Sequence, residues 1–157
     1  MFTAAVATAA LLAAACGSSS PSTAAASPSS SPVASPAAAA ATIAVATTKL
    51  GQILVDGKGI TVYLFVADTG TTSTCNSACA TVWPPVLTTG APQAGTGATA
   101  SLLGTTTRTD GTIEVTYAGH PLYYFVQDKS PGDTTGQGVN NFGGLWWVMS
   151  PAGAAIH

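Results

Sequence analysis

Charged side chains are scarce in this chain, and their scarcity excludes several functions. The 157 residues include four Lys and Arg, six Asp and Glu, and two His, so that only 6% are charged and the formal net charge is −2. Nucleic-acid binding calls for clustered Lys and Arg, which the sequence lacks. General acid–base catalysis needs positioned acids or histidines, and Glu114 is the only Glu. We therefore predict a protein that is not an enzyme and binds no nucleic acid.

The chain also lacks a hydrophobic run long enough to span a membrane. The Ala-rich stretch 2–15 is shorter than the roughly 20 residues of a membrane helix and ends in small residues before Cys16. This pattern is typical of a secretory signal, so residues 1–15 are predicted to be a signal peptide.

Residues 11–16, Leu-Leu-Ala-Ala-Ala-Cys, resemble a bacterial lipobox. The resemblance implies that Cys16 becomes the first mature residue and is acylated, with palmitate as an expected chain. The lipid would anchor the protein to the outer face of the cytoplasmic membrane. The alternative is full secretion, in which residues 13–15 form an ordinary cleavage site and Cys16 is a free thiol.

Beyond Cys16, residues 17–46 lack both charge and aromatic rings and consist almost entirely of Ala, Ser, Pro and Thr. Such a segment buries too little to offset the entropy of ordering it. We predict that residues 16–46 are a linker, either a stalk that holds a domain away from the membrane or a passive spacer.

The most informative feature present is a six-residue motif that occurs twice. Residues 63–68, Tyr-Leu-Phe-Val-Ala-Asp, return as residues 123–128, Tyr-Tyr-Phe-Val-Gln-Asp, and the match extends backwards so that 53–59 align with 113–119. A duplicated unit indicates two copies packed together.

We therefore predict one domain over residues 47–153, with repeat one at 48–88 and repeat two at 107–152. Asp-Gly turns between apolar runs predict hairpins over 52–66 and 102–117. Further strands are expected at 122–126 and 145–149, and a short helix at 76–82. The predicted fold is a compact all-β domain of two pseudo-symmetric hairpin or meander repeats with one short helix.

The motif strands are apolar on both sides. Tyr63 and Phe65 face one way, whereas Val62, Leu64 and Val66 face the other. Strands of this kind are usually covered on both faces, so we expect them at the centre of a common core.

Several motifs in this order resemble the bacterial secreted-repeat lipoproteins that carry a Yx(FWY)xxD motif. They are the two Tyr-x-Phe-x-x-Asp phrases, Cys75-x-x-x-Cys79 leading to Trp-Pro-Pro, Ala-Gly-His-Pro-Leu-Tyr at 118–123, and a closing Gly-rich segment ending at Trp146. The resemblance spans residues 48–152. It implies an envelope location, and the family has no established activity to carry over.

The motif residues Tyr63, Phe65, Asp68, Tyr123, Phe125 and Asp128 are the first candidates for a site. A structural role is expected, in which each Asp accepts N–H groups of the turn that directly follows it and each buried Tyr hydroxyl finds a partner. The alternative is that both acids and both phenols converge on one ligand or cation.

Cys75 and Cys79 lie at a spacing that allows a disulfide, which is the default in an oxidising compartment. A redox-active pair or a metal pair is the alternative, although zinc prefers four ligands and only His120 and His157 are available. His120 is expected to be a turn residue. Asp and Asn oxygens of segment 133–144 suit calcium, with ordinary turn formation preferred.

Adjacent residues of a strand face opposite sides, so one of Trp146 and Trp147 is expected in the core and the other nearer the surface. We predict a non-enzymatic binding or structural module without a cofactor, acting through a protein or cell-wall partner. The alternative is a redox- or cofactor-associated envelope protein that uses a metal, haem or electron transfer.

Overall fold

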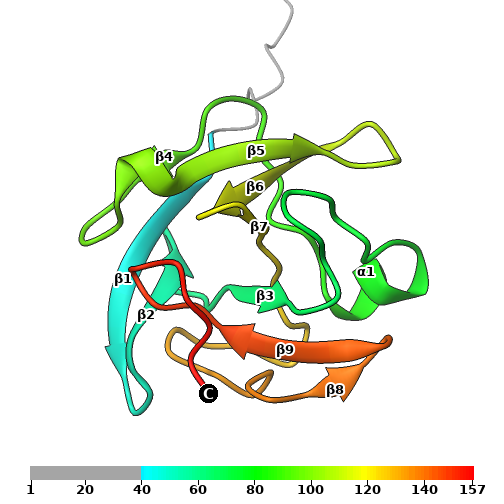
Figure 1. The fold of residues 1–157 in the computed structure, drawn as a ribbon. Helices are drawn as coiled ribbons and strands as arrows, with labels where there is room; N and C mark the ends of the chain where they lie inside the picture. The colour runs from blue at the N-terminus through cyan, green and yellow to red at the C-terminus, as the bar shows by residue number, and fades with distance from the viewer. Residues whose placement is uncertain (1–39) are drawn as a thin grey trace, which may run out of the picture. The chain divides into compact units, whose positions relative to one another are not determined.

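The computed structural model describes residues 40–157. The predicted signal peptide, Cys16 and most of the predicted linker lie outside the described residues. Within them the elements are β1 (Thr42–Thr48), β2 (Gly51–Asp56), β3 (Tyr63–Phe65), α1 (Ala78–Val82), β4 (Gln93–Ala94), the short 3-10 helix η1 (Ala100–Leu102), β5 (Leu103–Thr107), β6 (Ile113–Tyr117), β7 (His120–Pro121), β8 (Asn140–Asn141) and β9 (Gly144–Val148) (Figure 1). The predicted all-β domain with one short helix is confirmed.

The described strands form three small sheets, with the orders β2-β1-β4, β3-β9-β8 and β5-β6-β7. In Figure 1 the β5–β6 hairpin lies at the top, the β8–β9 hairpin at the bottom, and β3 between them. The β5–β6 turn shows why the predicted hairpin forms: Asp110 accepts the Thr112 N–H at 2.9 Å, and Gly111 adopts a φ of +82°. Such a φ is easily reached by glycine.

The first strand begins earlier than the predicted domain. Residues 42–46, predicted to be linker, form most of β1, which pairs antiparallel with β2 and parallel with β4. Ile43 is fully buried. The Ala-rich composition around this position hides the strand, because most residues of β1 are Ala or Thr and the strand depends on its pairing with β2 and β4 together with the burial of Ile43.

The two repeats meet at Tyr63 and Tyr123. Their backbones exchange both hydrogen bonds, with N···O distances of 2.8 and 3.0 Å. The strand that closes repeat two then pairs with the motif strand of repeat one, with Trp146 opposite Phe65 in the β3–β9 register. The segment after α1, which closes repeat one, likewise pairs with the motif of repeat two, through an isolated bridge between Pro85 and Tyr123. The repeats therefore pack as interlocked copies around a pseudo-twofold axis.

Both faces of the motif strands are covered, as predicted. One core cluster contains Tyr63 and Phe65, and a second contains Val62 and Leu64. The prediction is wrong at Val66, which is 54% exposed, and its counterpart Val126 is 36% exposed. Val66 directly follows the end of β3, whereas Val126 follows residues 122–125, which form only isolated bridges at Tyr123 instead of the predicted strand over 122–126. At both positions the chain turns away from the core.

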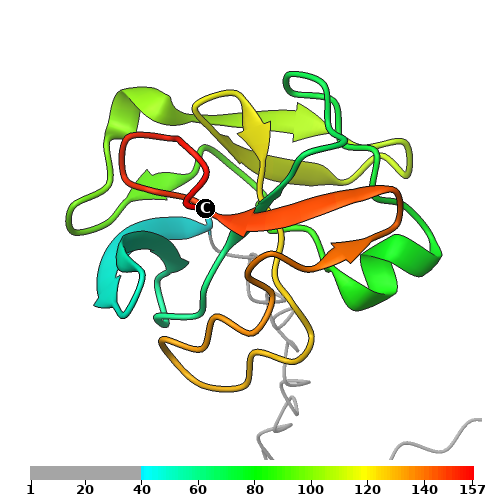
Figure 2. The ribbon, with the colours of Figure 1, turned by 60° about the horizontal axis from the view of Figure 1, so that its bottom comes forward.

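Helix α1 begins and ends within the predicted segment 76–82 and is followed by the buried Trp83. The Trp83 indole N–H donates to the Asn141 side chain at 3.0 Å, which ties α1 to β8. Figure 2 shows α1 beside the β8–β9 hairpin. No helix within residues 40–157 is long and apolar enough to cross a membrane.

Candidate functional site

Four aromatic rings from the two repeats form one continuous stack in the core. Phe65 lies on Trp146, with centroids 4.1 Å apart and planes 10° apart. Trp146 lies on Trp83 at 4.0 Å and 4°, and Trp83 lies on Phe125 at 4.2 Å and 22°. Because each Phe stacks on the Trp of the other repeat, the ring stack follows the pseudo-twofold symmetry of the domain.

Tyr63 and Tyr123 meet this stack edge-on. Tyr63 contacts Trp83 at 5.3 Å and 77°, and Tyr123 contacts Trp146 at 5.1 Å and 85°. Edge-to-face contacts place the positive edge of one ring against the negative face of another. The two phenols and the four stacked rings thus form one aromatic core.

Each Tyr hydroxyl donates to the Asp of the other repeat. The distance is 2.6 Å from Tyr63 Oη to Asp128 Oδ2 and 2.7 Å from Tyr123 Oη to Asp68 Oδ2. Hydrogen bonds to ionised carboxylates are among the strong ones in proteins. The motif therefore joins the repeats to one another.

The second carboxylate oxygen of each Asp holds a loop. Asp68 Oδ1 accepts the backbone N–H and the hydroxyl of Thr74 at 2.8 and 2.6 Å. Asp128 Oδ1 accepts the same two groups of Thr135 at 2.9 and 2.5 Å. The prediction that each Asp accepts N–H groups of the turn directly after it is wrong, because the loop folds back and presents a more distant Thr.

The amides that follow Asp128 have a different acceptor. The N–H groups of Lys129 and Ser130 both donate to Asp133 Oδ2 at 2.9 Å. Asp133 thereby caps a turn, as the simpler interpretation of segment 133–144 expected. Within residues 40–157, no group of three or more His, Cys, Asp or Glu side chains lies together so that it could hold a metal ion.

Both phenols of the motif remain protonated in the folded protein. Burial is the main cause that raises the pKa of Tyr63 and of Tyr123 far above the usual range of tyrosine. The hydrogen-bonded Asp128 raises the pKa of Tyr63 further, and the charge of Glu114 does the same for Tyr123. Neither phenol can act as a phenolate at physiological pH.

Among residues 40–157, a buried ion pair extends the network on the Tyr123 side and not on the Tyr63 side. Arg108 Nη1 donates to Glu114 Oε2 at 2.7 Å and to Ser73 Oγ, and Arg108 Nη2 donates to the Cys75 carbonyl at 2.6 Å. Ser73 Oγ in turn lies 2.8 Å from Tyr123 Oη. The chain of contacts thus connects Glu114 to the motif tyrosine.

Sequence reasoning missed this pair, although the aligned repeats contain a signal for it. Glu114 stands where repeat one has Leu54, and both positions are fully buried. Burial raises the pKa of Glu114 to about 7, against the opposing effect of Arg108. Glu114 Oε1 and Arg108 Nε have no hydrogen-bond partner among the described residues.

The predicted disulfide between Cys75 and Cys79 is present, with Cα atoms 5.2 Å apart. Both cysteines are buried in the same core cluster as the motif aromatics. Labile disulfides are usually exposed or strained, so burial favours the structural interpretation of this bridge.

The remaining candidates occupy the positions expected of them. Trp146 is fully buried, whereas Trp147 is half-buried and contacts His157 at 4.7 Å. The prediction that these neighbours divide between core and surface is confirmed. His120 is half-buried and lies opposite Tyr117 at the β6–β7 turn, outside the aromatic core.

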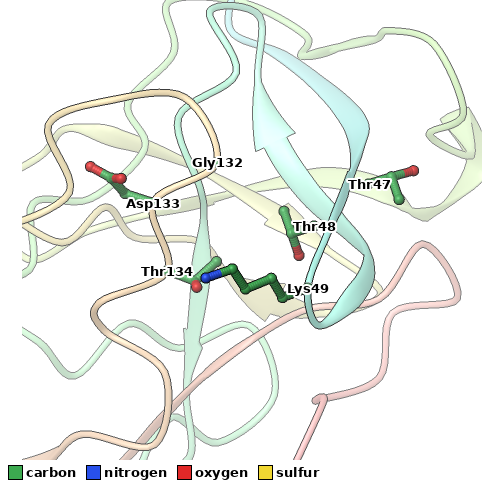
Figure 3. Close-up of a pocket in the computed structure, with 6 residues that line it drawn as sticks. All are labelled: Thr47, Thr48, Lys49, Gly132, Asp133 and Thr134. Carbon is green, nitrogen blue, oxygen red and sulfur yellow. The ribbon is translucent and has the colours of Figure 1, made fainter.

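A polar groove of about 330 Å³ lies between the β1–β2 turn and the loop around Asp133. In Figure 3 the Lys49 side chain extends towards Thr134, while the Asp133 carboxylate points away from the groove. That orientation agrees with the capping role of Asp133. The lining residues are Thr47, Thr48, Lys49, Gly132, Asp133 and Thr134.

Comparison with protein families matches residues 44–87 and 104–150 to a secreted repeat of unknown function. The two matched segments cover more than half of the chain and correspond to the two interlocked repeats. Their earlier starts, relative to the predicted 48 and 107, include most of β1 and β5. No curated protein and no solved structure matches the chain.

Proposed function

The chain belongs to the family of secreted repeats of unknown function, and on this premise we propose that it is a non-enzymatic binding or structural module that works outside the cytoplasm. The buried disulfide is consistent with an oxidising compartment. The repeated motif supplies a rigid scaffold, and its outer surface supplies the contacts with a protein or cell-wall partner.

This proposal rests on one observation: every acidic and phenolic group of the motif is buried and hydrogen-bonded within the domain. Asp68 and Asp128 are each only 8% exposed, and Tyr63 and Tyr123 are fully buried. All four groups bond to one another or to loop threonines. A general acid or base must reach its substrate, and these groups are enclosed by the scaffold that they hold together.

Phe142 is the side chain that we propose for partner contact. It lies at the tip of the β8–β9 hairpin with 45% of its surface exposed and a φ of +51°. A left-handed backbone costs a bulky residue about 1–2 kcal/mol, whereas Asn or Gly fits such a turn more easily. Turn formation therefore does not explain a Phe at this position, and its exposed ring is available for contact with a partner.

Sedimentation of the full-length protein with purified cell-wall material tests the binding role. We expect Phe142→Asn to reduce binding without lowering thermal stability, because Asn relieves the strained turn. The matched control is Leu87→Asn, which changes a side chain of similar exposure, 48%, elsewhere on the surface. Hydrolytic turnover by the wild type that disappears in Asp128→Asn would contradict the non-enzymatic role.

We further propose that Cys16 carries the lipid that holds the module at the outer face of the cytoplasmic membrane. In a bacterium that processes lipoproteins, the wild-type chain is expected to incorporate labelled palmitate and to sediment with membranes. Cys16→Ala is expected to be unlabelled and released. An unlabelled wild-type protein in the medium would instead indicate ordinary secretion.

A further inference from the structure

Two indoles lie parallel in the centre of the domain, and two phenols with their own carboxylates flank them. We propose that the Trp83–Trp146 pair is a site of one-electron oxidation, and that Tyr63 and Tyr123 are then oxidised in its place and carry the radical. This redox role is independent of the binding role proposed above, because it uses only the buried aromatic core.

The geometry of the indole pair favours the loss of an electron. The ring centroids are 4.0 Å apart and the planes differ by 4°, so the two π systems overlap and share a positive charge. Phe65 and Phe125 cover the outer faces of the pair and keep water away.

After the indole pair has lost an electron, it keeps its N–H protons. Both indole N–H groups donate to Asn141, to its side-chain oxygen at 3.0 Å and to its backbone oxygen at 3.4 Å. Amide oxygens accept hydrogen bonds but are poor proton acceptors. Asn141 is half-buried, so the residue that accepts from both indoles is itself partly exposed to solvent.

The flanking phenols are arranged to give up an electron and a proton together. Each contacts an indole edge-on, at 5.3 Å for Tyr63 and 5.1 Å for Tyr123. Each hydroxyl lies 2.6 or 2.7 Å from a carboxylate oxygen. Because burial raises the pKa of both phenols, the proton leaves only when the ring is oxidised, and the carboxylate is the acceptor within reach.

The step balances in electrons and protons. A one-electron oxidant, such as an oxidised metal complex or an oxygen-derived radical outside the cytoplasm, takes one electron from the indole pair and leaves a radical cation. The phenol then gives its electron to that cation and its O–H proton to the carboxylate. The products are a neutral indole pair, a neutral phenoxyl radical and a carboxylic acid.

The chain contains its own controls in its other two tyrosines. Tyr124 donates to the Asp56 carboxylate at 3.2 Å, and Tyr117 donates to the Pro151 carbonyl at 2.8 Å. In the described part of the chain, neither makes a ring contact with the indole pair. Tyr124 thus has a proton acceptor without the stack, and Tyr117 has neither.

Flash oxidation of the full-length protein with a photogenerated ruthenium(III) complex tests the proposal. A Trp147→Phe background removes the half-buried indole that would compete for the oxidant. We expect the absorption of an indole radical cation, followed by a phenoxyl signal in electron paramagnetic resonance. The signal is expected to disappear in the Tyr63→Phe/Tyr123→Phe variant and to persist in Tyr117→Phe and Tyr124→Phe.

The role of the carboxylates has a separate test. Asp68→Asn combined with Asp128→Asn is expected to slow phenoxyl formation by about 100-fold, since a positioned proton acceptor contributes on the order of 10²–10⁴-fold. Asp56→Asn is the control and is expected to leave the rate unchanged. Near-ultraviolet circular dichroism checks that each variant is folded, and the two Tyr→Phe variants decide the outcome if the Asn variants unfold.

Two results would overturn the proposal. One is a phenoxyl radical that forms in the folded protein on Tyr117 or Tyr124 but not on the motif tyrosines. The other is a phenoxyl yield that is unchanged in Trp83→Phe and Trp146→Phe, because the indole pair would then not be the intermediate. Cell-wall binding is expected to be unaffected by any of these substitutions that preserve the fold.

Discussion

At the scale of single residues, Glu114 distinguishes one repeat from the other. Its carboxylate is fully buried beside Arg108, where repeat one has the apolar Leu54. Removing two charges from water is costly, and a buried pair repays that cost only with good geometry and further hydrogen bonds. Arg108 has such bonds to Ser73 and to the Cys75 carbonyl, whereas one oxygen of Glu114 has none within residues 40–157.

The raised pKa of Glu114 predicts a pH dependence of stability. Burial moves this pKa from 4.5 to about 7, so the folded state binds a proton more tightly than the unfolded state. The stabilisation that comes from protonated Glu114 is complete below the pKa that Glu114 has in the unfolded state. The free energy of unfolding therefore falls as pH rises through about 7. Urea unfolding between pH 4 and 8 measures this slope.

Glu114→Gln is expected to flatten the slope, because Gln resembles the protonated acid and does not titrate. Asp110→Asn is the control: Asp110 is exposed, and its pKa is lowered mainly by its hydrogen bonds to Thr112. The stabilisation that comes from ionised Asp110 is lost only at more acidic pH. The Asp110→Asn variant should therefore keep the slope near pH 7. A free energy of unfolding that rises from pH 5 to 7 in the wild type would contradict the assignment.

The crossed Tyr–Asp pairs predict which substitutions interact energetically. Asp128→Asn is expected to cost about 1–3 kcal/mol, because it weakens the partner of a buried hydroxyl and of a loop. Residues that share a hydrogen bond show non-additive effects, while distant residues add. Tyr63→Phe should therefore be non-additive with Asp128→Asn and additive with Asp68→Asn in urea unfolding. The opposite pattern would mean that each motif pairs within its own repeat.

At the scale of elements, the segments that close each repeat connect the two halves. Strand β9 lies against β3 of the other repeat, and the segment after α1 bridges to Tyr123. Gly136 shows how closely the loop before β8 approaches the core. A Cβ at this position would lie 2.7 Å from the Trp83 ring and 2.9 Å from the Tyr63 ring.

Because β1 begins at Thr42, we expect the domain to require residues before position 47 for its stability. Ile43→Ala removes a fully buried side chain and is expected to cost about 2–5 kcal/mol. Thr47→Ala, at an exposed position of the same strand, is the matched control and should change little. Thermal unfolding of both variants gives the comparison. Equal stability of the two would mean that β1 is dispensable.

At the scale of the whole domain, the interlocked repeats predict one cooperative unfolding transition. The ring stack, the crossed hydrogen bonds and the β3–β9 pairing all join residues of different repeats. Neither half keeps these contacts alone, so coincident transitions are expected from Trp fluorescence and far-ultraviolet circular dichroism. Two separate transitions, or a folded repeat two by itself, would contradict the interlocked arrangement.

Features that depend on local pattern could be predicted from the sequence alone. Asp-Gly turns are sufficient to predict the β5–β6 hairpin, and alternating side chains predict the two-sided core around the motif, because turn chemistry and strand periodicity are properties of neighbouring residues. The disulfide between Cys75 and Cys79 could be predicted for the same reason. Strand β1 and the lack of a regular strand over 122–126 could not be predicted in this way.

The partners that meet across the two repeats are set by tertiary packing. The hydrogen-bonded Tyr–Asp partners are 65 and 55 residues apart, and their pairing follows from the exchange of closing strands. The burial of Glu114 beside Arg108 and the exposure of Val66 depend on the same packing. The Tyr–Asp contacts join residues that are distant along the chain, and the burial of Glu114 depends on which segments cover β6, so local sequence pattern carries no information on either.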